Sequence, residues 1–325
     1  MQPEFTLEAD RQDITDAIRD RLISLSVTDE SGIQSDTLEI KLDDRDRSVR
    51  LPRTGAELFL HLGYRNDKLS PMGLFIVDEL NTEGPPDSLT IRARAADFRQ
   101  SLKSQNTRSW ENVTLDDLTR TIAGNHQLEP VIAETLKDKT IAHIDQTEES
   151  DLHFLTRLAR QYDAVSTIKE GRLLFVPKGQ GRTASGKDLP AISLTPEQLT
   201  RYRFTMTDRG KYTAVIAHWH NSATAQRVPV RVGEPDTKPV YTLRGQHPDE
   251  EAAKVAARSK LDSLQRGTQT ASLTLPGSPS LRVEGKLTLT GFRNGIDGDW
   301  VINQVTHKLG RSGFVTTVRA ESVEG

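Results

Sequence analysis

Apolar and polar residues alternate along several short stretches of the first hundred positions. In 37–43, Leu38, Ile40 and Leu42 alternate with charged residues, and a period of two puts one face of a strand inward and the other in water. Related stretches follow at 57–62, 73–80 and 88–98. Turn-forming residues separate them at 43–46, 52–55 and 84–87. Short strands at this spacing predict a barrel or a sandwich.

The pattern changes to a helical period near residue 114. Thr114 followed by Asp117 is typical of a helix start, with a capping hydroxyl and a carboxylate in the first turn. Apolar residues then recur at helical spacing in 115–122 and again in 150–162, and two strands at 164–168 and 172–176 form a predicted hairpin. Residues 106–178 are therefore expected to form a small α+β module between two β regions.

The segment 178–190 is polar and rich in glycine, and it is the strongest candidate for a linker. Beyond it, strands are predicted at 201–207, 213–219, 226–231, 269–275, 286–290, 299–307 and 314–320. One helix interrupts them near 248–265, where Pro248 occupies a first helical position and acidic residues fill the first turn. Its alanines would let it pack closely against a sheet or a neighbouring subunit.

Composition narrows the class of protein. The chain has 325 residues, which suggests about two or three domains, and only 35% of them are hydrophobic and 5% aromatic, so thin cores and a large surface are expected. The formal net charge is −3 without a long Lys/Arg cluster, which argues against nucleic acid as the main partner.

The absence of cysteine excludes disulfides, thiolate metal sites and cysteine nucleophiles. No apolar run approaches the ~20 residues of a membrane span, and the first ten residues lack the pattern of a signal peptide. Synthesis in the cytoplasm without stable membrane insertion is the resulting expectation.

Few residues suggest chemistry. His218 and His220 would point to the same face of a strand, but no third metal ligand is evident near them. Adjacent carboxylates occur at Asp43/Asp44, Asp116/Asp117, Glu148/Glu149 and Glu250/Glu251. The first pair lies in a turn and the others at or just before helix starts, where the helix dipole favours negative charge. A structural role is therefore favoured over catalysis.

The glycines at 179, 181 and 186 do not form a phosphate-binding loop, because the Walker spacing and its strand-to-helix context are absent. The Gly-x-Ser-x-Gly and His-Glu-x-x-His motifs of hydrolases are absent as well. The sequence thus predicts no catalytic, cofactor-binding or metal-binding residue, and no cofactor.

Two motifs carry a family resemblance. The first runs through GDWVI at 298–302, VTHKL at 305–309 and GFVTT at 313–317, and the second through TEESDL at 147–152, FL at 154–155 and GRLLF at 171–175. In this order they resemble the phage late control gene D protein family, the baseplate hub proteins of contractile-tailed phages. That family is related in fold to the N-terminal part of VgrG spike proteins.

The resemblance implies a mainly β fold with an α+β insert. Two tube-like β-barrel domains are expected at 1–105 and 181–325, the second carrying the 248–265 helix, with the small α/β domain at 106–180 between them. It also implies a trimeric ring with pseudo-sixfold symmetry that joins the tail tube to the spike in the virion baseplate, with DNA only as cargo passing through its channel. Because the chain ends at Gly325, where VgrG proteins continue into a spike, a separate spike protein is expected.

The resemblance assigns no chemistry. Gly298 would allow a turn before a strand, Trp300 would bury a large area in a thin core, and His307 is expected to be packed or hydrogen-bonded. Two rival functions remain open: a cell-wall hydrolase used in penetration, and a module at 106–178 that binds peptidoglycan or another tail protein. Direct control of transcription is disfavoured by the neutral charge.

Overall fold

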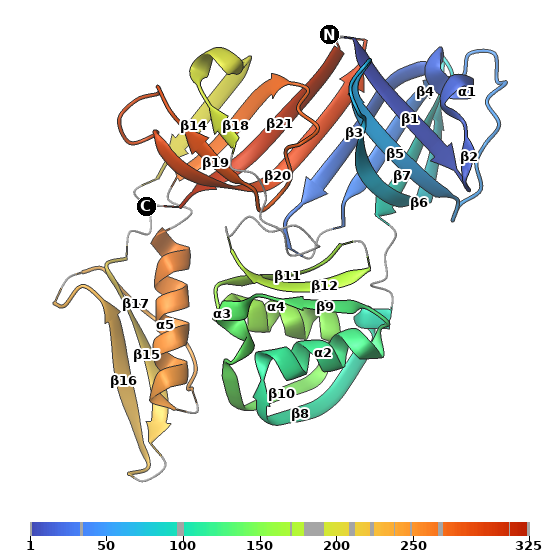
Figure 1. The fold of residues 1–325 in the computed structure, drawn as a ribbon. Coiled ribbons are helices and arrows are strands. Elements are labelled where there is room, and N and C mark those ends of the chain that lie inside the picture. Colours follow the sequence, from blue (N-terminus) through green and yellow to red (C-terminus); the bar gives the residue numbers. More distant parts are fainter. Residues whose placement is uncertain are drawn as a thin grey trace.

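The computed structural model describes residues 2–32, 35–95, 101–169, 171–178, 192–207, 212–221, 224–236, 238–247, 249–265, 269–311 and 313–323. A large antiparallel sheet forms the upper part of the molecule in Figure 1, and two smaller α/β units lie beneath it. The fold is mainly β, as the alternation of apolar residues predicts.

The large sheet has 13 strands and draws on both ends of the chain. From the N-terminal region come β1 (Pro3–Ala9), β2 (Gln12–Asp13), β3 (Leu22–Glu30), β4 (Thr37–Asp43), β5 (Glu57–Tyr64), β6 (Ser70–Glu83) and β7 (Ser88–Ala95), with the short helix α1 (Thr15–Arg19). From the C-terminal region come β13 (Ile192–Leu194), β14 (Arg201–Met206), β18 (Gln269–Pro276), β19 (Lys286–Leu289), β20 (Gly298–Gly310) and β21 (Gly313–Ser322).

The sheet consists of two halves with the same strand order. The N-terminal half-sheet runs β3-β4-β7-β6-β5-β1, and the C-terminal half-sheet runs β14-β18-β21-β20-β19-β13. The two-residue strand β2 lies outside this order, and if the other six strands of each half are numbered along the chain, both orders are 2-3-6-5-4-1. The pairings are antiparallel in both halves, except that β13 lies parallel to β19 whereas β1 lies antiparallel to β5. The chain therefore contains a structural duplication that the sequence does not reveal as a repeat.

The two halves join where β3 pairs with β20, and this pairing is called the seam below. The first residues of β20, 298–301, pair with β19, whereas residues 304–310 pair with β3. Side chains reinforce the seam, because the hydroxyls of Thr28 and Thr306 lie 3.2 Å apart and Asp29 accepts a 3.1 Å hydrogen bond from the backbone N–H of Val283.

Apolar packing also crosses the seam. Leu309 and Phe314 belong to the C-terminal half-sheet, yet they are buried in the core of the N-terminal half-sheet. The Tyr64 ring lies 5.6 Å from that of Phe314, and its hydroxyl donates a 2.9 Å hydrogen bond to the carbonyl of Gly277. Trp300 is fully buried in the other core, as expected, and its indole N–H donates to the carbonyl of Ile296 at 3.0 Å.

The first smaller unit, drawn in green in Figure 1, covers residues 101–178. It contains β8 (Gln105–Thr114), α2 (Leu115–Asn125), β9 (Glu129–Ile132), α3 (Glu134–Lys137), β10 (Thr140–Ser150), α4 (Asp151–Gln161), β11 (Ala164–Lys169) and β12 (Arg172–Pro177). β8 pairs with β10, and β11-β12-β9 form a second sheet. The predicted helices and hairpin are confirmed, and the apolar faces of α2 and α4 share one core with these strands.

The second smaller unit differs from the expectation. β15 (Ala214–Asn221), β16 (Gln226–Gly233) and β17 (Val240–Thr242) form a sheet of their own instead of joining β18–β21. Helix α5 (Glu250–Gln265) covers this sheet, and its Ala253, Ala257 and Leu261 pack against Val215 and Ala217. Small side chains on both elements permit this close approach, which satisfies the apolar face of β15 without the large sheet. Pro248 lies outside the described residues.

Closed barrels are not formed by the strand pairings of the described residues. The pairings follow one open path from β14 to β2, and only β13 and β19 lie off that path. The two barrels expected from the resemblance are therefore not closed in the described part of the chain. Instead, strand β3 of one half pairs with residues 304–310 of the other half at the seam, and the two halves form one open sheet. The division into folding domains at 1–105, 106–180 and 181–325 stays a prediction.

Packing across the seam can be tested at Gly277. A Cβ atom there would lie 2.0 Å from the Phe314 ring, so Gly277→Ala is expected to force that buried ring aside. The expected loss is roughly 1–3 kcal/mol of unfolding free energy, measured by denaturant titration. Gly124→Ala is the matched control, because nothing lies within 4 Å of the added methyl group and alanine favours the helix. Equal stability of the two variants would contradict the packing described.

Candidate functional site

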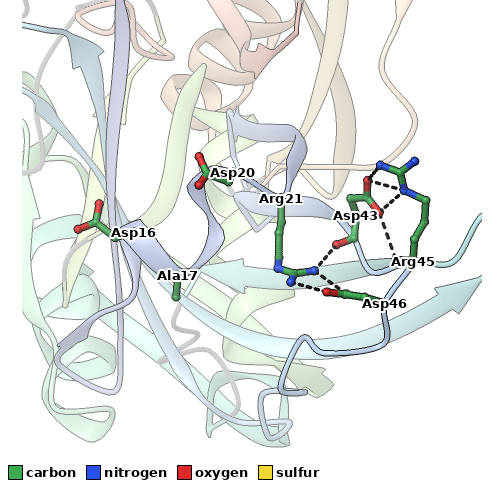
Figure 2. A pocket seen from close by; sticks show the side chains of 7 residues that line it. All are labelled: Asp16, Ala17, Asp20, Arg21, Asp43, Arg45 and Asp46. Atoms are coloured by element: carbon green, nitrogen blue, oxygen red, sulfur yellow. Dashed lines mark hydrogen bonds and ion pairs between the residues drawn. The ribbon is translucent and has the colours of Figure 1, made fainter.

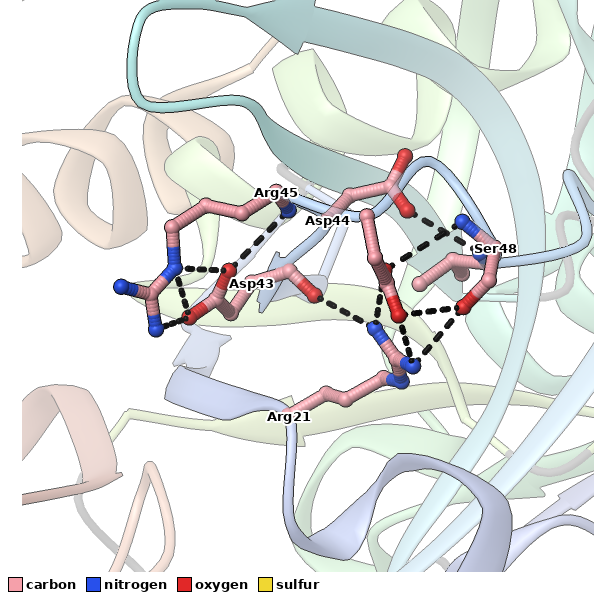
Figure 3. Close-up of polar contacts among 7 residues, drawn as sticks. Arg21, Asp43, Asp44, Arg45 and Ser48 are labelled. Atoms are coloured by element: carbon pink, nitrogen blue, oxygen red, sulfur yellow. Dashed lines mark hydrogen bonds and ion pairs between the residues drawn. The ribbon is translucent and has the colours of Figure 1, made fainter.

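A cluster of charged residues lies beside the start of β3 and the turn after β4. The Arg21 guanidinium donates 2.7 Å hydrogen bonds to both carboxylate oxygens of Asp46 and to the Ser48 hydroxyl. Arg45 forms a second ion pair with Asp43, in which its Nη2 lies 2.6 Å from the carboxylate. Figure 3 shows how these contacts fold the turn onto itself.

A hollow of about 500 Å³ opens beside this cluster and is also lined by Asp16 and Asp20 (Figure 2). Hydrogen bonds from Arg21 and Ser48 hold the pKa of Asp46 well below its usual range, and Arg45 lowers the pKa of Asp43. The carboxylates that bond are therefore ionised and already paired. This arrangement fixes the turn and leaves the hollow without a built ligand site.

The motif Glu149-Ser150-Asp151 starts helix α4, and each of its side chains has a separate structural task. The Ser150 hydroxyl caps the helix by accepting a 3.3 Å hydrogen bond from the backbone N–H of His153. Arg157 donates to the Glu149 carboxylate at 2.7 Å. The third side chain, that of Asp151, is buried.

Asp151 is held by three side chains of the 101–178 unit, two of which, those of Arg108 and His126, are distant in sequence. Gln146 donates to it at 2.7 Å, His126 Nε2 lies 2.8 Å from it, and Arg108 forms an ion pair with it. Burial by itself would raise the pKa of Asp151, but the hydrogen bonds from Gln146 and His126 and the charge of Arg108 outweigh it, so the pKa lies below its ordinary value. A buried, ionised carboxylate thus ties β8, β10 and α4 together.

The same cluster contains a hydroxyl, an imidazole and a carboxylate in series. Ser101 Oγ lies 2.8 Å from Nδ1 of His126, whose other nitrogen contacts Asp151. Hydrolases use such a series for proton transfer. Here the charge of the carboxylate is offset by Arg108, and neither the hollow beside Asp46 nor a smaller one beside Glu284 includes these residues. Sequence reasoning noticed the acidic motif but missed its partners.

The two candidate metal ligands lie on β15. His218 Nδ1 is 3.1 Å from the Arg227 guanidinium, and the backbone N–H of His220 donates to the carbonyl of His247 at 3.2 Å. Across the described ranges of the chain, no three His, Asp or Glu residues are placed so that they could hold a metal ion. The pair is therefore not brought together with a third ligand.

The paired carboxylates lie at the turn and helix starts where they were expected. Asp117 N–H donates to the capping Thr114 hydroxyl at 3.1 Å, and Asp116 pairs with Arg120 at 2.7 Å. In α5, Glu250 pairs with Lys254 at 2.7 Å. The glycines at 179, 181 and 186 lie outside the described residues.

His307 lies in β20 at the seam, where it is 1% exposed. Its Nδ1 is 3.0 Å from the Thr316 hydroxyl, and its ring lies 6.1 Å from that of Phe314. Burial, together with the charge of Arg282, lowers the pKa of His307 to about 4. A neutral, packed imidazole therefore occupies this position at neutral pH.

The fold and these clusters define a sheet-built protein whose main polar networks hold its own elements together. Comparison with known proteins specifies the family. Residues 76–313 match the family model described as phage tail baseplate hub (GPD). The chain belongs to this family and is a baseplate hub protein of a phage tail. No helix in the described part of the chain is long and apolar enough to cross a membrane.

Individual relatives have names that match the description of this family. A probable baseplate hub protein of Escherichia phage 186 is 39% identical, with 99% of this chain and 93% of the relative covered, and its counterpart in Escherichia phage P2 is 37% identical over the same shares. The fold is similar to that of a tail protein from Neisseria meningitidis (TM-score 0.73, 12% identity, 99% and 97% covered). It is also similar to that of a type VI secretion component from E. coli (TM-score 0.56, 10% identity, 92% and 73% covered). The predicted family is thus confirmed.

The Asp151 network gives a stability prediction. Asp151→Ala would leave Arg108 without its buried partner, so a loss of about 3 kcal/mol of unfolding free energy is expected at neutral pH. Because the folded-state pKa of Asp151 is lowered, this contribution is present above about pH 4 and is lost as the pH falls below that value. Denaturant titrations at pH 7 and pH 3 measure both effects.

The matched control for this comparison is Asp16→Ala, since the Asp16 side chain is 99% exposed. A change within about 0.5 kcal/mol is expected there at either pH. If Asp151→Ala behaved like Asp16→Ala, the network would not stabilise the 101–178 unit.

Proposed function

We propose that three copies of this chain form a ring that joins the tail tube to the spike of the baseplate. The observation that supports this most directly is the shared strand order of the two half-sheets. If each half-sheet acts as one tube-like unit, three copies present six such units to a sixfold tube and three chains to a threefold spike. The structural duplication supplies both symmetries from one kind of subunit.

The partners follow from this position. A separate spike protein and the tail-tube protein would contact opposite sides of the ring, and DNA would pass through its channel without specific binding. The formal net charge of −3 fits a channel that does not retain nucleic acid. Synthesis in the bacterial cytoplasm and incorporation into the tail complete the proposal.

A purely structural role is part of the same proposal. In the Ser101-His126-Asp151 series the carboxylate is paired with Arg108, which offsets the charge that would otherwise stabilise a protonated imidazole. The hydroxyl, imidazole and carboxylate contact one another at the start of α4, and these contacts hold the helix in place. The rival function, degradation of peptidoglycan, needs a nucleophile or a carboxylate pair that faces a substrate cleft.

The mass of the purified chain tests the ring. Three copies of the 36.2 kDa chain have a mass of about 109 kDa, and light scattering across a concentration series is expected to approach that value. Negative-stain images should show rings. A mass that stays at one or two copies at the highest concentration would contradict the proposed assembly.

Peptidoglycan zymography tests the structural role. Neither the wild-type chain nor Ser101→Ala is expected to clear the gel, because Ser101 is assigned to hydrogen bonding with His126. Clearing by the wild type that disappears in Ser101→Ala would overturn this assignment and establish a hydrolase.

A further inference from the structure

We propose that neighbouring copies join by strand pairing, with β14 of one copy lying antiparallel to residues 79–83 of β6 in the next. This inference rests on the proposed association of copies and specifies its interface. It follows from the seam, which shows within one chain how an edge strand of one half-sheet docks on the other half-sheet.

The strands β6 and β20 occupy the same position in their half-sheets, and their irregularities coincide. A bulge interrupts the pairing of β6 with β7 at Asp78, and one interrupts the pairing of β20 with β21 at Asn303. The residue that follows each bulge, Glu79 or Gln304, lies opposite an arginine of the next strand. Residues 79–83 of β6 therefore correspond to residues 304–308 of β20.

Backbone contacts beside the bulges support this correspondence. The N–H of Gly55 donates to Val77 at 2.7 Å, and the N–H of Glu284 donates to Ile302 at 2.8 Å. Both donors have a positive φ, 83° at Gly55 and 62° at Glu284. The same local geometry thus recurs at equivalent places in the two halves.

One of these equivalent strands has a partner that the other lacks. Beyond its bulge, β20 pairs with β21 on one side and with β3 on the other. Beyond its own bulge, β6 pairs with β7 alone among the described strands, because its pairing with β5 ends at Ile76. Residues 79–83 therefore present an open sheet edge where their counterpart holds a strand.

The counterpart of β3 is β14, which is the end strand of the sheet and pairs with β18 alone among the described strands. Val27 of β3 lies opposite Leu38, and Phe204 of β14 lies opposite Ala271, at equivalent positions of the two halves. In Figure 1, β14 and β6 lie on opposite sides of the large sheet of one chain, so the docking strand and the docking edge meet only between copies.

If β14 and β6 of neighbouring copies pair in the same register as β3 and β20 at the seam, the residues that face each other can be predicted. Leu80 would face Met206 of the next copy, Asn81 would face Thr205, and Glu83 would face Arg203. The pair Asn81/Thr205 corresponds to Thr306/Thr28, whose hydroxyls lie 3.2 Å apart in the seam.

The two edges are complementary. Met206 and Tyr202 on β14 are each 52% exposed, an unusual exposure for large apolar side chains on an edge strand. Arg201 and Arg203 have no ion-pair partner among the described residues, and the opposing edge carries Glu79 and Glu83, which pair with Arg92 and Lys41 of their own chain. A bare edge of this kind is a template for pairing with another chain.

Disulfide trapping tests the register, and the chain offers a clean background because it has no cysteine. Backbone Ser31 N–H donates to Asn303 at 3.1 Å, so by alternation Thr28/Thr306 and its counterpart Thr205/Asn81 are non-hydrogen-bonded pairs with close Cα atoms. The double variant Asn81→Cys/Thr205→Cys is therefore expected to form disulfide-linked multimers on mild oxidation of the purified chain, visible in non-reducing gels.

Two matched variants complete the experiment. Thr82→Cys/Thr205→Cys places the first thiol on the opposite face of the strand, so few multimers are expected. Thr28→Cys/Thr306→Cys should form a disulfide within one chain and migrate as a monomer.

The outcomes separate this inference from the proposed ring. Multimers from Asn81→Cys/Thr205→Cys alone would support the strand pairing. If the chain associates in light scattering but that variant stays unlinked, or links no better than Thr82→Cys/Thr205→Cys, the proposed interface is wrong and the ring survives. If the chain neither associates nor cross-links, both proposals fail.

Discussion

The pairing of β3 with β20 is the contact on which the rest of the structure depends. Without it, each half-sheet would expose an edge of unpaired backbone groups, and the residues that cross the seam, such as Leu309 and Phe314, would lose their core. The neutral His307 packs at the same place, so apolar contacts stabilise the seam in addition to the backbone hydrogen bonds between β3 and β20.

The smaller units are insertions that leave this sheet intact. The 101–178 unit lies between the two halves in sequence, and the unit of β15–β17 with α5 lies between β14 and β18. A hydrogen bond of 3.0 Å from the Ser259 hydroxyl to the carbonyl of Arg160 connects the two units beneath the sheet. Because each unit has its own core, the edges of the large sheet stay available at both ends. The duplicated strand order then allows one chain to supply two similar building blocks.

Local pattern predicted the local elements well and their assembly poorly. The alternation of Leu38, Ile40 and Leu42 predicted β4 with its observed bounds, and the capping signal at Thr114 predicted α2. Polar strands such as β8 and β10 were missed, because most of their residues are exposed or half-buried and the two strands satisfy each other. The separate sheet of β15–β17 could not be predicted, since alternation shows that a strand has an apolar face but not which surface covers it.

The Asp151 network could not be predicted either, because its partners Arg108 and His126 lie 43 and 25 residues away from Asp151 in the sequence. A cryo-electron microscopy map of the assembled hub that resolves individual strands would show whether neighbouring copies join as the two half-sheets of one chain do. We expect an uninterrupted sheet around the ring, in which junctions between copies have the same strand arrangement as the seam inside each chain. A map in which copies meet through the smaller units while the ends of the large sheet stay apart would contradict it.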